Sequence, residues 1–177
     1  FIWNSFFVSL TSTALQVLCS SMSAYAFSRF RFPGRNVIFI AFLSSMMIPG
    51  AVMGIPRFII MSRMHLIDQH AALILPAMFS AMGIFLIRQF MLSIPNSYDE
   101  AAYIDGAGRL YCFSRIVAPM AKPAMMVIAV QTFIGTWNDF YNPLIYINSV
   151  NKMTLPLGLT ALSGMLGSGS GSAILAG

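Results

Sequence analysis

Four stretches of the chain are apolar over the length that a helix needs to cross a membrane. A hydrocarbon layer about 30 Å thick requires about 20 mostly apolar residues. The stretches cover residues 6–27, 37–56, 71–91 and 124–147. A strongly apolar soluble core could explain one such run but not four. The pattern therefore predicts an all-α protein, a polytopic transmembrane helical bundle.

Proline and glycine interrupt two of these stretches. The second contains "MMIPGAVMGIP" at residues 46–56, and the third contains Pro76 and Gly83. Such breaks are tolerated in a membrane where neighbouring helices or water satisfy the freed backbone carbonyls. We expect both helices to be kinked and to face protein.

Composition agrees with a lipid environment. The chain is 58% hydrophobic and 8% charged, whereas soluble domains average about 25% charged residues. Its net charge of +5 comes from scattered Lys and Arg residues separated by apolar runs, so no basic face for nucleic acid can be assembled. Cys19 and Cys112 lack metal-ligand spacing, and we expect free thiols and no metal site.

The two ends of the sequence suggest a piece of a longer protein. The chain starts at Phe1, and the last residues, "SAILAG", turn apolar after a Gly- and Ser-rich stretch. They could begin another span or form a flexible tail. We expect a fragment truncated at both ends, with about four to five spans.

Basic residues predict the orientation, because short cytoplasmic loops are enriched in Lys and Arg. Two crossings separate the loop after the first stretch from the region after the third, so both lie on one side. Together they hold seven of the ten basic residues: Arg29, Arg31, Arg35, Arg88, Arg109, Arg115 and Lys122. We expect this side to be cytoplasmic.

The polar window at residues 98–123 holds three of the five acids of the chain. Ser97 and Glu100 have the spacing of a capping box, and Asp99 adds negative charge to the first helical turn. Gly106 and Gly108 predict the end of this helix. A second helix is expected from Arg109 to Val117, ending against Pro119. The window therefore predicts a helix, a tight turn and a helix.

The residues of this window resemble a known motif. Glu100, Ala101 and Ala102, followed by Gly106, Ile116 and Pro119, are similar to the "EAA" loop of permease subunits of bacterial ABC importers, with Ala118 where Leu is usual. Further matches are "SAYAFSRFRFPGR" at residues 23–35, "MMIPGAVMGIP" and "WNDFYNPLIY" at residues 137–146. They cover almost the whole chain and resemble the carbohydrate branch, in the subunit type of the maltose permease.

The resemblance implies one transmembrane permease domain over residues 1–177 with a cytoplasmic EAA coupling-helix loop at residues 93–123. Members of the family usually have six spans, so this chain would lack the first and most of the last. In the family, the loop docks into a cleft of the ATP-hydrolysing subunit. The residues carried over to ATPase coupling are Glu100, Ala101, Ala102, Asp105, Gly106, Ile116 and Pro119.

The resemblance also implies partners and a location. The partners are an ABC ATPase subunit dimer, a second permease subunit in a heterodimer or homodimer, and an extracytoplasmic substrate-binding protein. The location is the inner or plasma membrane of a bacterium, with several spans in lipid. No catalytic residue and no cofactor are expected, because the sequence has one Glu, no Walker A loop and no HExxH pair.

The last predicted span carries polar groups that are costly in hydrocarbon. The candidate substrate-path residues are Gln131, Trp137, Asn138, Asp139, Tyr141 and Asn142. Sugars suit such a lining, since hydroxyls bond to amides and carboxylates while ring faces stack on aromatic side chains. The alternative is structural. Trp137 and Tyr141 could anchor the membrane interface, and Asp139 could cap a helix broken before Pro143.

The sequence thus favours a subunit that forms the translocation pathway for a sugar or oligosaccharide. Permeation of another small polar solute such as a glycerol-phosphate is an alternative. A channel or secondary transporter outside the ABC class also uses broken helices, but neither has a reason to carry the EAA spacing. A membrane scaffold that transports nothing is the third option.

Overall fold

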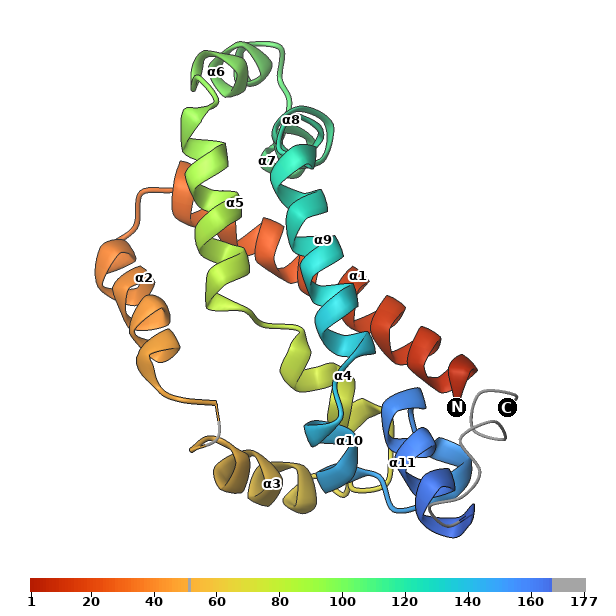
Figure 1. The fold of residues 1–177 in the computed structure, drawn as a ribbon. Coiled ribbons are helices and arrows are strands. Elements are labelled where there is room, and N and C mark those ends of the chain that lie inside the picture. The colour runs from red at the N-terminus through yellow and green to blue at the C-terminus, as the bar shows by residue number, and fades with distance from the viewer. Residues whose placement is uncertain (51, 167–177) are drawn as a thin grey trace. The chain divides into compact units, whose positions relative to one another are not determined.

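The computed structural model describes residues 1–50 and 52–166, and this part is helical with no strand (Figure 1). The predicted all-α class is confirmed. The expectation for "SAILAG" lies outside the described residues. The chain divides into two compact units, which are described separately. The first unit comprises Phe1–Thr13, Met53–Ala77 and Thr132–Gly177, and the second comprises Ala14–Val52 and Met78–Gln131. One domain over residues 1–177 stays a prediction.

Two helical stretches are long and apolar enough to cross a membrane, Ile2–Arg29 and Ala71–Ser93. A third is added if the bent pair Arg109–Met120 and Lys122–Trp137 counts as one span. The second predicted stretch is shorter than expected. Helix α2 (Arg35–Ser44) continues as a 3-10 turn only to Met47, since the prolines and glycines that follow interrupt it. The predicted break within residues 46–56 is confirmed.

The second unit packs the end of α1 (Ile2–Arg29) against α2, α5 (Ala81–Ser93) and the start of α9 (Lys122–Trp137). Ser80 caps α5 by accepting from the Gly83 amide at 3.1 Å. Gly83 itself permits close approach, because a Cβ there would lie 2.9 Å from Ser20 Oγ. Small residues at helix contacts are how membrane helices pack without a hydrophobic driving force.

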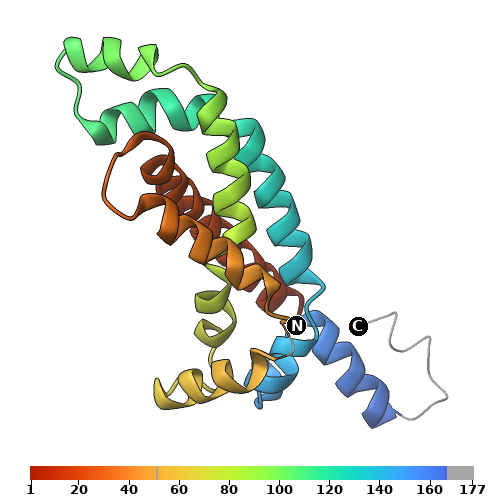
Figure 2. The ribbon, with the colours of Figure 1, turned by 90° about the vertical axis from the view of Figure 1, so that its left-hand side faces the viewer.

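Two short helices follow α5 in the second unit: α6 (Ser97–Ile104) and α7 (Arg109–Tyr111) (Figure 2). A π-helical segment, Cys112–Val117, and α8 (Ala118–Met120) continue the chain beyond α7. This helix was expected to end at about Val117, against Pro119, but it continues through Pro119 to Met120. Pro119 lies at the start of α8, directly after the π-helical segment. The chain then bends by 76° next to the fully buried Ala121.

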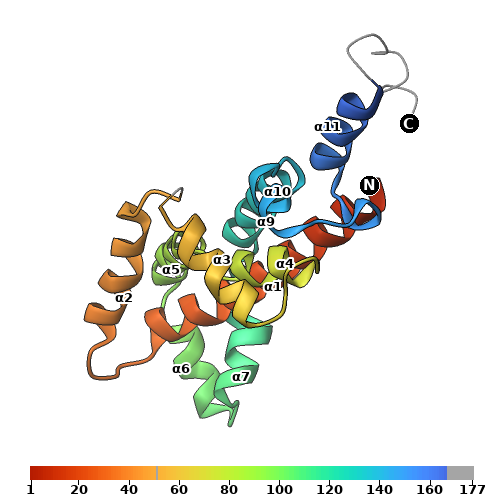
Figure 3. The ribbon, with the colours of Figure 1, turned by 90° about the horizontal axis from the view of Figure 1, so that it is seen from below.

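The first unit contains α3 (Gly54–Arg63), α4 (Ala71–Ala77), α10 (Tyr141–Tyr146) and α11 (Leu155–Leu166) (Figure 3). Helix α10 packs on α4, and Phe58 stacks on Tyr146 with ring centroids 6.4 Å apart. The backbone at Gly54 lies under the Tyr141 hydroxyl, which would be 3.0 Å from a Cβ there. Helix α11 was not predicted. Ser5 Oγ accepts from the Leu155 amide at 2.7 Å and so fixes its first turn.

A stripe of polar side chains follows one face of α1. Its members recur at helical spacings of three and four and are all buried: Ser5, Ser9, Ser12, Thr13, Gln16 and Ser20. The hydroxyls of Ser9, Ser12, Thr13 and Ser20 have no hydrogen-bond partner among the described residues. Exposed residues such as Trp3, Leu10 and Leu18 are large and apolar. Helix α1 therefore buries its hydroxyl side chains and exposes large apolar side chains.

Candidate functional site

Helix α6 has the predicted position, but its N-terminus is built differently from the predicted capping box. The residue that precedes the helix is Asn96, and no side chain caps the first turn. The capping box of Ser97 and Glu100 is therefore wrong. Asn96 has helical backbone angles, and its side-chain oxygen accepts from Arg29 Nη1 at the end of α1 and not from an amide of the first turn. Asp99 and Glu100 do lie in the first turn, where the helix dipole favours acids.

The C-terminus of α6 is a glycine turn of the expected kind. Gly106 has φ +82°, in the left-handed region that glycine accepts without a Cβ penalty. The Ala107 amide donates to the Ala102 carbonyl at 2.9 Å, and the Gly106 amide donates to the Tyr103 carbonyl at 3.1 Å. These two bonds form a Schellman motif and satisfy the last carbonyls of the helix. The predicted stop at Gly106 is confirmed.

A buried ion pair fixes α6 to the end of α1. Arg29 Nε lies 2.8 Å from Asp99 Oδ2, and each side chain is only 7% exposed. The same guanidinium donates to the Ile94 carbonyl at 3.0 Å. One arginine thus holds the turn before α6 and the helix itself. Sequence reasoning missed this contact, because it assigned Asp99 to the helix dipole and Arg29 to the orientation signal.

The other faces of α6 do not take part in this ion pair. Glu100, Ala101 and Asp105 are exposed, whereas Ala102 is buried. An open groove of about 640 Å³ runs between α6 and the helix after it. Its lining includes these residues of the predicted motif: Ala101, Ala102, Asp105, Gly106 and Ile116. Pro119 is exposed on α8 and does not line the groove. The structure therefore brings five of the seven motif residues to one surface.

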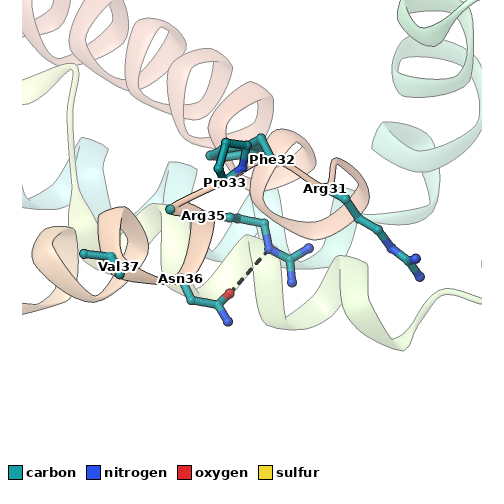
Figure 4. Close-up of a pocket in the computed structure, with 7 residues that line it drawn as sticks. Arg31, Phe32, Pro33, Arg35, Asn36 and Val37 are labelled. Carbon is teal, nitrogen blue, oxygen red and sulfur yellow. Dashed lines mark hydrogen bonds between the residues drawn. The ribbon is translucent and has the colours of Figure 1, made fainter.

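The loop between α1 and α2 contributes basic groups beside this helix. Arg35 donates to Asn36 Oδ1 at 3.4 Å and to the Phe30 carbonyl at 3.2 Å, while the exposed Arg31 extends away from Asn36 (Figure 4). A polar cavity of about 320 Å³ is lined by both arginines together with Asp99 and Glu100. The arginine loop and α6 are therefore on the same side, as the count of membrane crossings predicted.

Two of the candidate substrate-path residues, Asp139 and Asn142, form a second polar site, in the first unit. The chain breaks after α9, and Asp139 holds the start of α10. Its Oδ1 accepts from the Asn142 amide at 3.2 Å, and its Oδ2 accepts from Asn142 Nδ2 at 2.6 Å. The structure thus supports the capping role that the sequence left open for Asp139. Both residues also line a cavity of about 110 Å³.

The other candidate path residues are placed separately. Trp137 stacks on Phe133 with ring centroids 5.8 Å apart, and Phe133 meets Phe6 edge to face at 6.5 Å. Asn138 donates to the Ile134 carbonyl of its own helix at 2.9 Å. The remaining two do not join the cavity: Tyr141 and Gln131. Of the six predicted residues, the cavity unites only Asp139 and Asn142.

A polar clamp fixes the loop that joins α10 to α11. Asp68 lies between α3 and α4 with φ +62°, and it accepts from the Asn148 and Ser149 amides at 3.0 and 2.8 Å. Its Oδ2 also accepts from Ser149 Oγ and Lys152 Nζ. The Ser149 hydroxyl and amide, followed by Lys152, hold the pKa of the Asp68 carboxyl well below its usual range. No sequence pattern had pointed to this contact.

Comparisons with known proteins agree on one family. Residues 16–177 match the family described as "Binding-protein-dependent transport system inner membrane component". The arabinooligosaccharides transport system permease protein AraQ of Bacillus subtilis (strain 168) is 38% identical over 160 residues. The sn-glycerol-3-phosphate transport system permease protein UgpE of Salmonella typhimurium is 37% identical over 169 residues.

These matches cover most of this chain and part of each relative. The aligned regions are 90% of the chain and 57% of AraQ, and 96% of the chain and 59% of UgpE. A crystal structure of a bacterial ABC transporter involved in the import of the acidic polysaccharide alginate matches 97% of the chain and 62% of its own chain, with a TM-score of 0.82 and 27% identity. The chain belongs to the family of inner membrane components of binding-protein-dependent transport systems.

Proposed function

We propose that the chain is the greater part of a membrane subunit of an ATP-driven importer, and that α6 couples it to a separate ATPase. The supporting observation is the anchoring of α6. A buried arginine ties the helix to α1, while Glu100, Ala101 and Asp105 stay exposed. A rigid helix fastened to a membrane span transmits the motion of a docked partner better than a loose loop does.

The groove beside α6 is the proposed docking surface for the ATPase. It combines small residues, which allow close approach, with Asp105 and Arg115 at its edges. The ATPase is expected as a dimer, with a second permease subunit completing the translocation pathway. An extracytoplasmic binding protein would deliver the solute, as the family description implies.

The proposed solute is a sugar or oligosaccharide. AraQ is named for arabinooligosaccharides, and the similar crystal structure belongs to an importer of a polysaccharide. UgpE is named for sn-glycerol-3-phosphate, which keeps a phosphorylated polyol as the second candidate. The polar cavity is lined by the carboxylate of Asp139 and the guanidinium of Arg57, which suits the hydroxyls of a polyol as acceptor and donor.

The test of coupling uses the full-length protein with its partner permease, ATPase and binding protein in liposomes. Glu100→Lys reverses a charge in the first turn of α6, where the helix dipole opposes a cation. We expect loss of ATPase co-purification, or hydrolysis that no longer drives uptake. Asn151→Lys is the control, since Asn151 is exposed and lies in a loop of the first unit. If Glu100→Lys retains the ATPase and coupled uptake, α6 is not the docking helix.

Orientation is tested by labelling. The two native cysteines are replaced by serine, and a cysteine is placed at the exposed Ser97. An impermeant thiol reagent should label it only after the cells are permeabilised. Labelling in intact cells would place α6 outside the cytoplasm and overturn the coupling proposal.

A further inference from the structure

A small polar cavity in the first unit is lined by side chains that the coupling proposal does not involve. Its volume is about 110 Å³, and five polar side chains line it: Arg57, Thr136, Asp139, Asn142 and Thr154. Apolar residues such as Pro76 and Ala77 of α4 form the rest of the wall. The polar residues come from α3, from residues 136–142 at the end of α9 and the start of α10, and from the position before α11. Three segments of the chain thus converge on one cavity.

The cavity contains a buried hydroxyl that lacks a partner. Thr154 is 3% exposed, and its Oγ1 has no hydrogen-bond partner among the described residues. Leaving a buried polar group unsatisfied costs about 1 to 3 kcal/mol. A group that enters the cavity and bonds to this oxygen would remove that cost.

Donors and acceptors are present together in the cavity wall. Arg57 offers only N–H donors, and Asp139 offers only acceptors. No ion pair joins these two residues within the described part of the chain. The Asp139 carboxylate is held in place by Asn142, and its two oxygens still have capacity to accept. The cavity therefore presents separated donor and acceptor groups whose positions are fixed by the fold.

A hydroxyl can bond to both Arg57 and Asp139, because it donates one hydrogen bond and accepts others. Two neighbouring hydroxyls of a sugar could use Asp139 as acceptor and Arg57 as donor at once. The carbon-bound hydrogens beside them would face Pro76 and Ala77. A carboxylate or a phosphate dianion could pair with Arg57 but has no hydrogen to give to Asp139, so it would leave that carboxylate without a donor.

The volume limits how much of a sugar can enter. Complete ligand pockets occupy about 300 to 1,000 Å³, and one water occupies about 30 Å³ in the liquid. A cavity of about 110 Å³ holds the equivalent of roughly three or four waters. It suits one hydroxyl-bearing edge of a sugar and not a whole ring.

We infer that this cavity is a subsite that binds a pair of adjacent hydroxyls on the transported solute, with Asp139 accepting, Arg57 donating and Thr154 completing the contact. The inference rests on the proposed function, in which the chain forms the translocation pathway. It adds Arg57, Thr136 and Thr154 to the path residues and selects neutral vicinal diols over anionic groups.

The test compares two threonine variants of the full transporter in liposomes, with arabinotriose and sn-glycerol-3-phosphate as the probes. Thr154→Val removes the orphan hydroxyl at nearly constant volume. Thr160→Val is the matched control on the same helix, since that hydroxyl bonds to the Pro156 and Leu157 carbonyls and does not line the cavity. We expect Thr154→Val to raise KM for arabinotriose several-fold at unchanged ATPase co-purification, and Thr160→Val to leave KM unchanged.

A labelling experiment gives a readout that does not depend on turnover. A cysteine at Thr136, in a background without Cys19 and Cys112, reports on the cavity through its reaction with a small thiol reagent. Arabinotriose should slow this reaction, and inorganic phosphate, an anion without a diol, should not. An unchanged KM in Thr154→Val, or labelling of the cysteine at Thr136 that arabinotriose does not slow, overturns the subsite.

The parental protein separates this inference from the proposed function. If it takes up arabinotriose while Thr154→Val behaves like the parent, the subsite fails and the importer proposal stands. If the parent takes up only sn-glycerol-3-phosphate, the preference for neutral diols is wrong. If the parent, with its ATPase bound, drives uptake of neither probe and no other sugar competes for labelling, both proposals fail.

Discussion

Two aspartates of this chain each pair with a basic side chain, in opposite surroundings. Asp99 and Arg29 are both 7% exposed, and the pair joins α6 to α1. The side chains of Asp68 and Lys152 are 26% and 40% exposed, and this pair joins the loop after α10 to the turn before α4. In the buried pair, removal of one partner leaves an uncompensated charge. In the exposed pair, water replaces what is lost.

The comparison also distinguishes how each acid is held. Asp99 pairs with the side chain of Arg29, so one side chain carries the anchor. Asp68 has four donors, of which two are backbone amides. A contact spread over several donors survives the loss of one, whereas a single buried partner cannot be replaced. Loss of one side chain should therefore release the buried pair, whereas the contact of Asp68 should tolerate the loss of one donor.

The largest effect is expected from Asp99→Ala, which leaves Arg29 buried without its counter-charge. Loss of one partner of a buried pair costs about 3 to 5 kcal/mol. We expect faster amide exchange throughout α6 and loss of the co-purified ATPase. The double variant Arg29→Met with Asp99→Leu removes both charges and should restore protection of α6. Equal exchange in Asp99→Ala and the parent would show that the pair does not anchor the helix.

Gly106→Leu comes next, because it forces a side chain into a left-handed backbone. The cost of this conformation is about 1 to 2 kcal/mol for a residue with a Cβ. We expect fraying of the last turn of α6, seen in amide exchange of residues 102–107, and weaker coupling of hydrolysis to uptake. Gly108→Leu is the control for amide exchange alone, since Gly108 has φ −78° and open space around it but also lines the groove. Identical behaviour of the two variants would contradict the role of the turn.

A smaller, pH-dependent effect is expected at Asp68. Its pKa is lower in the folded protein than in the unfolded chain, so its stabilising contribution is complete above about 3.9 and is lost as the pH falls below that value. A spin label at the exposed Val150 should keep the same mobility from about pH 7 to about pH 5 and become progressively more mobile as the pH falls below about 4 toward the folded-state pKa of Asp68. Asparagine, like aspartate, tolerates φ +62°, so Asp68→Asn should keep this backbone conformation. We expect it to leave the label mobile over the whole pH range.

The same experiment can contradict the assignment to Asp68. A change of label mobility between about pH 7 and about pH 5 lies above the range in which this carboxyl contributes a pH dependence.

The smallest effect is expected from Lys152→Gln. Its ammonium is partly exposed, and Asp68 keeps the Asn148 and Ser149 donors when the charge is removed. Glutamine can still donate to the Asp68 carbonyl, which the lysine contacts at 2.7 Å. We expect a spin label at Val150 to change mobility much less than in Asp68→Asn. An equal change in both variants would show that the lysine alone holds the loop.

Much of the fold could be predicted, since apolar length and turn residues are local properties. The helix and turn of residues 97–106 were predicted correctly because glycine accepts the left-handed backbone that ends a helix, as Gly106 does. The capping box was wrong because spacing alone does not fix where a helix begins. Asn96 already has helical backbone angles, so Ser97 lies inside the helix, and Arg29, 67 positions before Asn96, bonds to the Asn96 side chain.

The candidate site was predicted less completely than the fold. The motif residues from Ala101 to Ile116 do share a groove, but the anchor that positions α6 depends on a tertiary contact. The polar cavity shows the same limit. Asp139 and Asn142 stood out as polar residues in an apolar stretch, whereas Thr154 and Arg57 became notable only when folding placed them beside these two. Helix α11 was missed because its apolar run is too short for a span.

The buried hydroxyl stripe of α1 has a consequence for biogenesis. The stretch Ile2–Arg29 has a lower mean hydropathy than Ala71–Ser93, although it is the longer of the two. In a bilayer without neighbours, the hydroxyls of Ser9, Ser12 and Ser20 would face hydrocarbon, which offers no hydrogen bonds. Helix α1 should therefore leave the translocon slowly on its own and rely on later helices to be retained. Stable insertion of α1 then depends on helices that follow it in the chain.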